Sequence, residues 1–534
     1  MINLLKPVDQ GPLRLTTILA LSLLVTLFVV VTKSHGFPAP AATLWAEDGN
    51  IFLSQASELG IRSLFTPYAG YLHLWPRMFA YLSSWLPANM APALLFAGWC
   101  CAFALMAGIV LKRLTDYQVA PVLVVVFTCL AGLQPTTHET FFTITNAQWF
   151  LAIGIFFYVI LEGNTKNGLI DYIILALLCL TGPFCIILAP FALAKVFLKK
   201  GKVDRFFYSI FFISATLQVL IIATAGRAGS GPMSLDPYAW VMAAKIFLLF
   251  GAEIILLPVA FWITVAGGTI YLIQKHPKPA GEHLWLTTLL VLGALALYLS
   301  GLWSSKHAPS MISPLGGGAR YYVPAYGIIF ITIPFLFKLR PYVALPALAT
   351  MILLCWQLYL PFNRGDVQYQ AYTEFSKVKS GVFTPINPVM ASFPGWGIPG
   401  HSIASGGASS YEYNLKDLAA NSEDVSHGGS GRLFDFKAED PQILLTNALV
   451  CPDARYIGIS ISVNRSLDGW AQLFWADDKG FREKHSLRRY YPAGESTMDF
   501  AFPNHRDGIK VRLDPSEAQG ATEVRSITVY CLPG

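Results

Sequence analysis

The feature that most limits the fold of this chain is a series of apolar runs, each of about 20 residues, that recur between Leu15 and Leu360 and then stop. A run of this length can cross the hydrocarbon core of a bilayer as a helix. Only 13% of the residues are charged, whereas roughly a quarter are charged in ordinary soluble domains. The sequence therefore predicts a multi-pass α-helical membrane protein followed by a soluble part.

The two parts also differ in charge. The first 360 residues contain 21 Lys and Arg against 12 Asp and Glu, and the remainder contains 17 against 20. Basic residues follow alternate apolar runs, as they do in the cytoplasmic loops of membrane proteins. This excess is expected to orient helices in the lipid bilayer, so no nucleic-acid partner is predicted.

The apolar runs predict about eleven transmembrane helices. Nine are single spans, and the stretch between Lys166 and Lys195 predicts a hairpin of two short helices, because Thr181-Gly182-Pro183 interrupts it. With a cytoplasmic N-terminus, this odd number places the chain from Pro361 onward on the outer, periplasmic face of the inner cell membrane. The nine single spans are Leu15–Thr32, Ala91–Leu111, Val119–Leu133, Ala147–Leu161, Phe206–Thr224, Ile246–Ile273, Leu284–Trp303, Tyr322–Phe337 and Pro341–Leu360.

The first outer loop, from about Lys33 to Met90, is far longer than the inner loops. Apolar residues recur at helical spacing in Ile51–Leu59, and aromatic residues do much the same in His73–Trp85. Both stretches predict amphipathic helices that lie in the membrane interface.

The remainder of the chain predicts a soluble, mainly-β domain, a small antiparallel sandwich. We expect a transmembrane domain over 1–360, a Gly-, Ser- and Pro-rich connecting segment over 361–430 and the sandwich over 431–534. Short alternating stretches between turn signals predict its strands: Tyr456–Val463, Ala471–Trp475, Thr497–Phe502, Ile509–Leu513 and Val524–Tyr530.

Two cysteines, Cys451 and Cys531, lie in this β-rich part, and the other six lie in apolar segments. In an oxidising compartment the two would be free to pair, and we expect a disulfide that joins the first and last strands of the sandwich. Two unpaired buried thiols are the alternative.

The adjacent carboxylates Glu47 and Asp48 are the candidate catalytic residues. A carboxylate that faces a cavity can deprotonate an acceptor hydroxyl, and a second charge beside it would raise one pKa. A solvated turn at Asp48-Gly49 is the alternative interpretation.

Further polar residues are candidate contacts for a sugar or a phosphate. They share a position in the outer loops or at the outer mouth of a helix, where an ionisable group near the membrane is a functional candidate. Interfacial anchoring or a structural hydrogen bond is the alternative for each. These residues are Tyr71, His73, Arg77, His138, Glu139, Asn146 and Gln148.

A run of glycines precedes Arg320 and Tyr321 at the start of a predicted span. Backbone N–H groups at a helix start, together with a guanidinium, could hold a phosphate, with Lys306, His307 and Arg227 adding charge. A membrane anchor is the alternative. Histidines show no metal-binding spacing, so no cofactor is predicted, and the sequence does not exclude a divalent metal.

This arrangement resembles the GT-C superfamily of multi-pass glycosyltransferases, in particular bacterial enzymes that modify O-antigen or related surface polysaccharide. The order of helices and loops is similar over Met1 to Leu360. Sequence motifs are similar only in Trp45–Phe52 and Gly318–Tyr322. It implies that the loop acid is Glu47 or Asp48 and that Arg320 contacts the carrier phosphate. Many members place Asp before Glu, whereas this chain has the reverse order, so the base stays unassigned. On strand pattern and exposed aromatic residues, the tail is similar to galactose-binding-like or jelly-roll carbohydrate-binding modules.

The resemblance implies an inverting glycosyltransferase that moves a sugar from a polyprenyl-phosphate carrier to a lipid-linked or surface glycan acceptor. The carboxylate would activate the acceptor hydroxyl, and the phosphate would leave toward Arg320. The alternatives are a lipid-linked glycan ligase or polymerase, and a non-enzymatic lipid or solute transporter. Against the transporter, charged residues are sparse in the middle of the predicted helices, with Glu253 the main exception.

Overall fold

A computed structural model describes residues 13–34, 39–161, 163, 167–198, 203–225, 232–275, 280–338, 340–362, 364–399, 408–426, 431–437, 439–505 and 508–533. The chain divides into two compact units. The first, which we call the helical unit, comprises Met1–Ala41, Gln55–Leu86 and Ala93–Asn363. The second, the β unit, comprises Ala42–Ser54, Pro87–Pro92 and Arg364–Gly534.

Apolar helices build the helical unit, and six of those described are long and apolar enough to cross a membrane. Four of these spans lie within α1 (Leu15–Ser34), α10 (Arg205–Ala225), α12 (Leu256–Lys275) and α13 (Ala280–Ser304). The other two begin in a 3₁₀ turn: Ala88–Asp116 continues into α5 (Ala91–Asp116), and Ala319–Leu336 continues into α14 (Val323–Leu336). Shorter apolar helices accompany them: α6 (Pro121–Gly132), α7 (Ala147–Ile160), α8 (Leu169–Cys179), α9 (Phe184–Leu198), α11 (Pro237–Leu248) and α15 (Ala344–Gln357). The helical character predicted for this part is confirmed, and eleven crossings remain a prediction.

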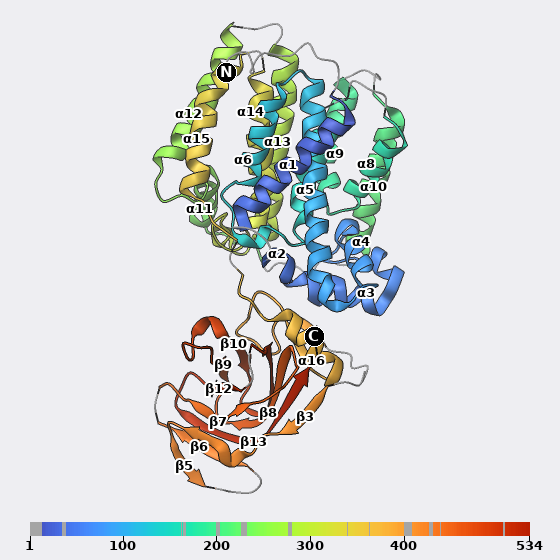
Figure 1. Ribbon diagram of the computed structural model, residues 1–534. Helices are drawn as coiled ribbons and strands as arrows, with labels where there is room; N and C mark the ends of the chain where they lie inside the picture. The colour runs from blue at the N-terminus through green and yellow to red at the C-terminus, as the bar shows by residue number, and fades with distance from the viewer. Residues whose placement is uncertain are drawn as a thin grey trace. The chain divides into compact units, whose positions relative to one another are not determined.

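Two helices, α7 and α14, form the interior of the helical unit. Every residue of α14 is buried, and so is every residue of α7 except Trp149. In Figure 1, α14 stands among α6, α13 and α15. Both helices are apolar on all sides, which is the pattern expected of a helix that other helices surround.

The single span predicted over Ile246–Ile273 is wrong, because α11 ends at Leu248 and α12 begins at Leu256. Phe250 has a left-handed backbone with φ of 56°, and the Gly251 N–H donates to the Ile246 carbonyl. This pattern is a common way to end a helix. The break also moves Glu253 out of any helix.

The predicted hairpin of two short helices is confirmed. Helix α8 ends at Cys179 and α9 begins at Phe184, with Gly182 between them at a φ of 88°. Glycine adopts this left-handed conformation without a steric penalty, so the Gly-Pro pair turns the chain as expected.

The two stretches of the first loop are helical, as predicted. Residues Asp48–Leu53 form a short π-helix that continues into α3 (Ser54–Leu59), a 3₁₀ turn follows over Gly60–Phe65, and α4 spans Leu74–Ser83. One face of α4 is buried, and its exposed positions include Leu82. This agrees with an amphipathic helix, and its place in a membrane interface remains a prediction.

Two antiparallel sheets form the β unit (Figure 1). One has the strand order β10-β9-β12-β7-β4 and the other β11-β8-β13-β6-β5, with β3 paired to β13. Their bounds are β3 (Ser409–Glu412), β4 (Leu418–Ala420), β5 (Glu423–Ser426), β6 (Arg432–Phe436), β7 (Ile443–Leu449), β8 (Tyr456–Arg465), β9 (Gly469–Trp475), β10 (Ser486–Tyr491), β11 (Gly494–Pro503), β12 (Ile509–Asp514) and β13 (Gly520–Leu532). All five predicted strands are present.

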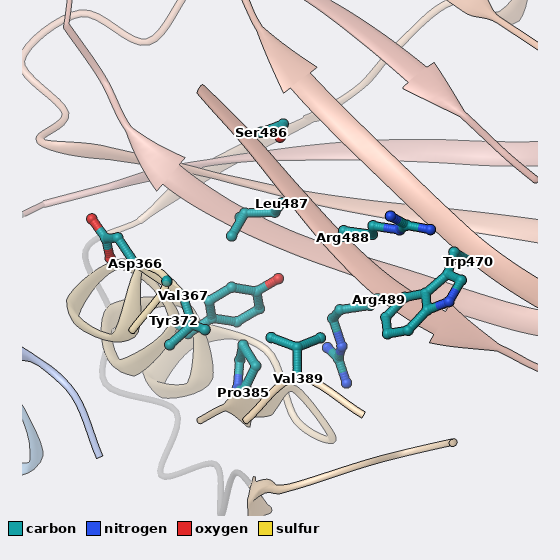
Figure 2. Close-up of a pocket in the computed structure, with 11 residues that line it drawn as sticks. Asp366, Val367, Tyr372, Pro385, Val389, Trp470, Ser486, Leu487, Arg488 and Arg489 are labelled. Carbon is teal, nitrogen blue, oxygen red and sulfur yellow. The ribbon is translucent and has the colours of Figure 1, made fainter. Parts of the chain in front are cut away.

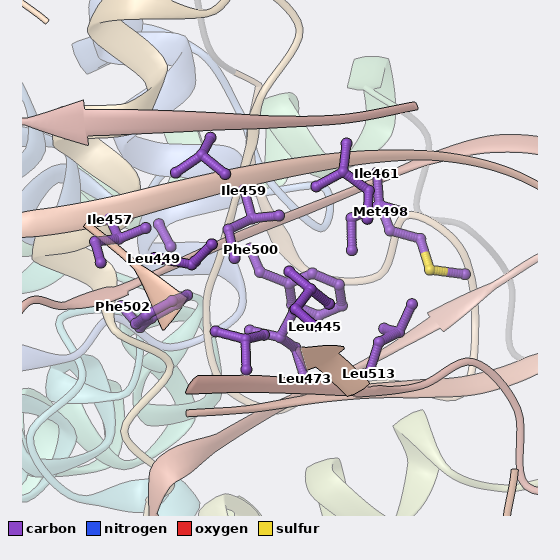
Figure 3. Packing of buried hydrophobic residues seen from close by; sticks show 14 of the residues in the cluster. Leu445, Leu449, Ile457, Ile459, Ile461, Leu473, Met498, Phe500, Phe502 and Leu513 are labelled. Atoms are coloured by element: carbon purple, nitrogen blue, oxygen red, sulfur yellow. The ribbon is translucent and has the colours of Figure 1, made fainter. Parts of the chain in front are cut away.

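Alternating apolar side chains form the core of the β unit. On β8, every second residue from Ile457 to Val463 is almost fully buried. Figure 3 shows the three isoleucines of β8 packed with side chains from β7, β9, β11 and β12, including Leu473, Phe500 and Leu513. Alternation with a period of two is what a sandwich requires of its strands.

The connecting segment expected over 361–430 is more structured than its composition indicates. It contains α16 (Tyr369–Val378), the paired strands β1 (Phe383–Pro385) and β2 (Gly397–Pro399), and strands β3 to β5 of the sandwich. Tyr372 and Phe375 of α16 are fully buried in the sandwich core, which explains why this helix is ordered there. Cys451, just after β7, and Cys531 of β13 form a disulfide, so the bond does not start from the first strand.

Candidate functional site

Arg320 and Glu139 lie together in the helical unit, although 181 residues separate them. The Arg320 Nη1 atom is 3.8 Å from Glu139 Oε2, and the Arg320 backbone N–H donates to the same carboxylate at 3.4 Å. Arg320 lies in a short 3₁₀ turn, Ala319–Tyr321, that follows Gly318 with its left-handed backbone. The sequence placed both residues at the same membrane face but gave no reason to pair them.

Two N–H groups that follow the glycine run already have acceptors, since that of Tyr321 donates to the Gly318 carbonyl and that of Tyr322 to the Ala319 carbonyl. The Arg320 side chain beside them is 37% exposed. Its guanidinium also lies 5.3 Å from the ring of Tyr321.

Asn146 connects this pair to the start of α7. Its Nδ2 atom donates to the Glu139 carbonyl at 2.6 Å, and its Oδ1 atom accepts from Trp149 Nε1 at 3.1 Å. The Trp149 ring in turn meets the Tyr321 ring edge-on at 5.4 Å. Four predicted residues, Glu139, Asn146, Arg320 and Tyr321, therefore form one group, which we call the Arg320 cluster together with Trp149.

Gln148 faces a different neighbour, the tip of the α8–α9 hairpin. Its side chain is buried, and a Cβ atom on Gly182 would come within 2.7 Å of its Oε1 atom. Within the described part of the chain this oxygen accepts no hydrogen bond. The backbone of His138 is in a 3₁₀ turn, and its side chain lies outside the described residues.

The loop that carries Tyr71, His73 and Arg77 packs against the same hairpin. The Leu74 N–H donates to the Leu180 carbonyl, and the Gly182 N–H donates to the Leu72 carbonyl. Gln218 of α10 joins both segments, because its Oε1 atom accepts from Leu72 N and its Nε2 atom donates to the carbonyl of Gly182. Gln218 was not predicted as a site residue, although a lone amide within an apolar helix was the available signal.

His73 and Arg77 are both buried, each with 1% of its surface exposed. Burial lowers the pKa of His73 to about 3, and the charge of Arg77 acts in the same direction. Burial also lowers the pKa of Arg77, to about 10. The His73 ring stacks on Tyr71 with centroids 4.4 Å apart, so this histidine is a neutral, packed side chain at physiological pH.

Glu47 and Asp48 belong to the β unit, and they differ in exposure. Asp48 is 2% exposed, whereas Glu47 is only partly buried. The guanidinium of Arg364 is 4.6 Å from the Trp45 ring. Burial lowers the pKa of Arg364 to about 9, while the charge of Asp48 opposes that shift. Asp48 is therefore a buried carboxylate with a cation nearby.

Strand-like contacts hold the carboxylate pair within the β unit. Ala46 N–H donates to the Asn387 carbonyl at 2.6 Å, and Asn387 N–H donates to the Leu44 carbonyl at 3.1 Å. Gly49 packs closely against Ile386 and Ile398, where an added Cβ would come within 2.9 Å of Ile386. Arg364 and Asn387 were not predicted as site residues, because nothing in the local sequence links them to residues more than 300 positions earlier.

Two of the other predicted charges are Lys306 and Arg227. Lys306 has its ammonium 5.0 Å from the Trp303 ring, and Arg227 lies outside the described residues. Within the described ranges, no three His, Cys, Asp or Glu side chains are close enough to hold a metal ion.

Comparison with known proteins identifies no family. No family model matches the chain, and no curated protein matches it in sequence. Among solved structures, the arabinosyltransferase EmbB from Mycobacterium smegmatis is 9% identical, with 96% of this chain and 64% of that chain covered and a TM-score of 0.27. A family 29 carbohydrate-binding module from Piromyces equi is 11% identical over 23% of this chain and 91% of that chain, with a TM-score of 0.18. At these TM-scores, neither likeness establishes the fold or the function of this chain.

Proposed function

We propose that this protein is a membrane glycosyltransferase that moves a sugar from a polyprenyl-phosphate carrier to a lipid-linked or surface glycan acceptor. The observation that carries the proposal is the Arg320 cluster, in which a partly exposed guanidinium lies among amide and aromatic side chains next to the ends of apolar helices. A leaving phosphate needs positive charge, and a guanidinium can bind two of its oxygens at once.

The contact between Arg320 and Glu139 suits exchange with a ligand. At 3.8 Å the two groups are farther apart than a hydrogen bond requires, and such partly exposed pairs contribute at most about 1 kcal/mol. The carrier phosphodiester has one negative charge, as Glu139 has, and it offers two oxygens to the guanidinium, so it can replace Glu139 at small cost. More negative charge develops on the phosphate as the sugar leaves, which strengthens its contact with Arg320. Asp48 or Glu47 is proposed as the base that deprotonates the acceptor hydroxyl, so that the sugar is transferred with inversion.

The decisive assay offers membranes that contain this protein a panel of radioactive polyprenyl-phosphate sugars and follows label into acceptor glycan. Transfer of one sugar from the monophosphate carrier supports the proposal. Label that moves only as a preformed glycan from a diphosphate carrier would identify a ligase or polymerase instead. Movement of labelled lipid between leaflets without transfer would identify a transporter.

Arg320 provides the first variant test. Arg320→Ala should raise the half-saturating carrier concentration roughly 10-fold or more, because a charge-assisted hydrogen bond contributes about 1.5–3 kcal/mol. Arg320→Lys should recover part of the loss, since an ammonium cannot form the two-pronged contact. Half-saturation for the acceptor should change little.

Glu139→Gln is the matched control, and the expected change has the opposite sign. Without the competing carboxylate, Arg320 should bind the carrier at the same or a lower concentration. If Glu139→Gln instead abolishes turnover at saturating carrier, Glu139 is the base. If both Arg320 variants keep normal carrier dependence but insert poorly, Arg320 is an anchor in the membrane interface.

A further inference from the structure

A pocket of about 280 Å³ lies within the β unit, at the edge of a sheet. Strand β10 ends the order β10-β9-β12-β7-β4, and four of its residues line the pocket together with Trp470 of β9. Figure 2 shows Asp366 across the pocket from Trp470, with the Tyr372 ring between them. An edge strand offers backbone N–H and C=O groups to a ligand as well as side chains.

Trp470 supplies a flat apolar surface beside polar groups. Its side chain is partly exposed on the outward face of the sheet, and the Arg488 guanidinium lies 4.8 Å from its ring. A sugar ring has apolar C–H faces and a rim of hydroxyl groups, so it can stack on an indole while its rim meets polar side chains. Pockets with a few polar groups on apolar walls are typical small-ligand sites.

The charges that line the pocket are predominantly positive. Arg488 and Arg489 contribute two cations, and Asp366 contributes one carboxylate. That carboxylate already accepts two hydrogen bonds from Gln368, each at 2.8 Å. Behind the pocket, Asp499 is paired with Lys379 at 3.0 Å, so its charge is also partly balanced.

The two arginines differ in exposure and in their partners. Arg489 is 7% exposed and its Nη1 atom donates to the Phe383 carbonyl at 3.3 Å, which fixes its position. Arg488 forms an ion pair with Glu517 in which both side chains are well exposed. Exposed pairs of this kind contribute little, so Arg488 can exchange Glu517 for an anionic ligand.

We propose that this pocket binds a sugar residue that carries a carboxylate, with the sugar ring against Trp470 and the carboxylate against Arg488. The ligand class is an acidic saccharide, such as a uronate unit of a glycan. This binding site is independent of the proposed transferase activity, so either can fail without the other.

The test uses the full-length protein in detergent and measures binding by titration calorimetry. One probe is trigalacturonate, and the second is its methyl ester, which has the same ring shape without the charges. We expect the acid to bind with a dissociation constant at least about 10-fold below that of the ester, and the difference should shrink as salt is added. Equal affinity for the two probes, or no binding of either, would overturn the proposal.

Variants separate the two contacts. Arg488→Gln should remove the preference for the acid over the ester. Trp470→Ala should weaken the binding of both probes about 10-fold or more. Trp470→Phe should restore part of the affinity, because it keeps an aromatic face. Arg525→Gln is the matched control, since Arg525 is on β13 of the other sheet and pairs with Glu495 and Glu523. An unchanged preference in Arg488→Gln, or an equal loss in Arg525→Gln, would contradict the assignment.

Discussion

Asp48 has 2% of its surface exposed and lies near the charge of Arg364, whereas Glu47 is partly exposed. A buried carboxylate needs a partner, and removing one member of such a pair is destabilising. Because only Asp48 is fully buried, separate substitutions of Asp48 and Glu47 should have different effects. The sequence alone gave no basis for this distinction.

Asp48→Asn should reduce sugar transfer by about 10²–10⁴-fold, the usual contribution of a general base, and Glu47→Gln should reduce it less. Transfer at saturating donor and acceptor is the measurement. Thermal unfolding of each variant is the control, because Asp48→Asn also leaves the charge of Arg364 less balanced. Near-normal transfer by both variants would show that the base is elsewhere.

His73 should make the stability of the protein depend on acid. The pKa of His73 is about 3 in the folded chain and near 6.5 in the unfolded chain. Between these two values the unfolded state binds a proton that the folded state does not bind. The His73 contribution is thus present above pH 6.5 and is lost as the pH falls toward 3. Thermal midpoints of His73→Gln should fall less with acid than those of the parent, with His307→Gln as control. Parallel curves for parent and His73→Gln would refute the burial argument.

At the scale of elements, the tip of the α8–α9 hairpin has no room for an added methyl group at Gly182. Gly182 has a φ of 88°, and an added Cβ would lie 2.5 Å from the Phe184 ring and 2.7 Å from Gln148. Gly182→Ala should therefore destabilise the protein by about 1–3 kcal/mol through backbone strain, with a further contribution from crowding. The thermal midpoint in detergent should fall.

Gly267 of α12 is the control for that change, because nothing lies within 4 Å of its hypothetical Cβ. There, alanine should be neutral or stabilising by up to about 1 kcal/mol, since it favours helix more than glycine does. Equal midpoints for Gly182→Ala and Gly267→Ala would mean that the hairpin tip is not tightly packed.

The break between α11 and α12 bears on the choice between transporter and transferase. Glu253 was the main charged residue expected in the middle of a helix, and it lies in the turn between Leu248 and Leu256 instead. Non-helical backbone at membrane depth lines cavities in membrane proteins, transporters included. The position of Glu253 in a helix break therefore does not favour the transferase over the transporter.

At the scale of the whole molecule, the disulfide is in one unit and the free cysteines that the structure describes are in the other. Cys451 and Cys531 of the β unit are bonded, and the cysteines described in the helical unit are free. Disulfides persist in oxidising compartments. We therefore expect the β unit to lie outside the cytoplasm, as the alternating basic loops also predict.

A phosphatase fused after Gly534 should be active, and mass spectrometry without reduction should recover the peptides of Cys451 and Cys531 as one species. Substituting both cysteines with alanine should lower the stability of the β unit by about 2–4 kcal/mol. An inactive phosphatase together with a fluorescent cytoplasmic fusion would reverse the orientation. Alkylation of both thiols in native protein would exclude the disulfide in cells.

The sequence by itself determined the features that depend on local pattern. Apolar runs predict helices, the Thr181-Gly182-Pro183 break predicts the hairpin, and alternation with a period of two predicts β8 and its neighbours. Each of these follows from the burial of one face or from the conformational range of one residue, so a window of ten to twenty residues contains the information.

Only the tertiary structure decided which distant segments meet. It brought Glu139 to Arg320, and it placed Asp48 in the β unit with Arg364. It also ended α11 at Leu248, just before Phe250, a residue that adopts a left-handed backbone while its buried ring packs 4.6 Å from Tyr326. Such contacts form because packing over the whole chain outweighs local preference, and no single window of sequence records them.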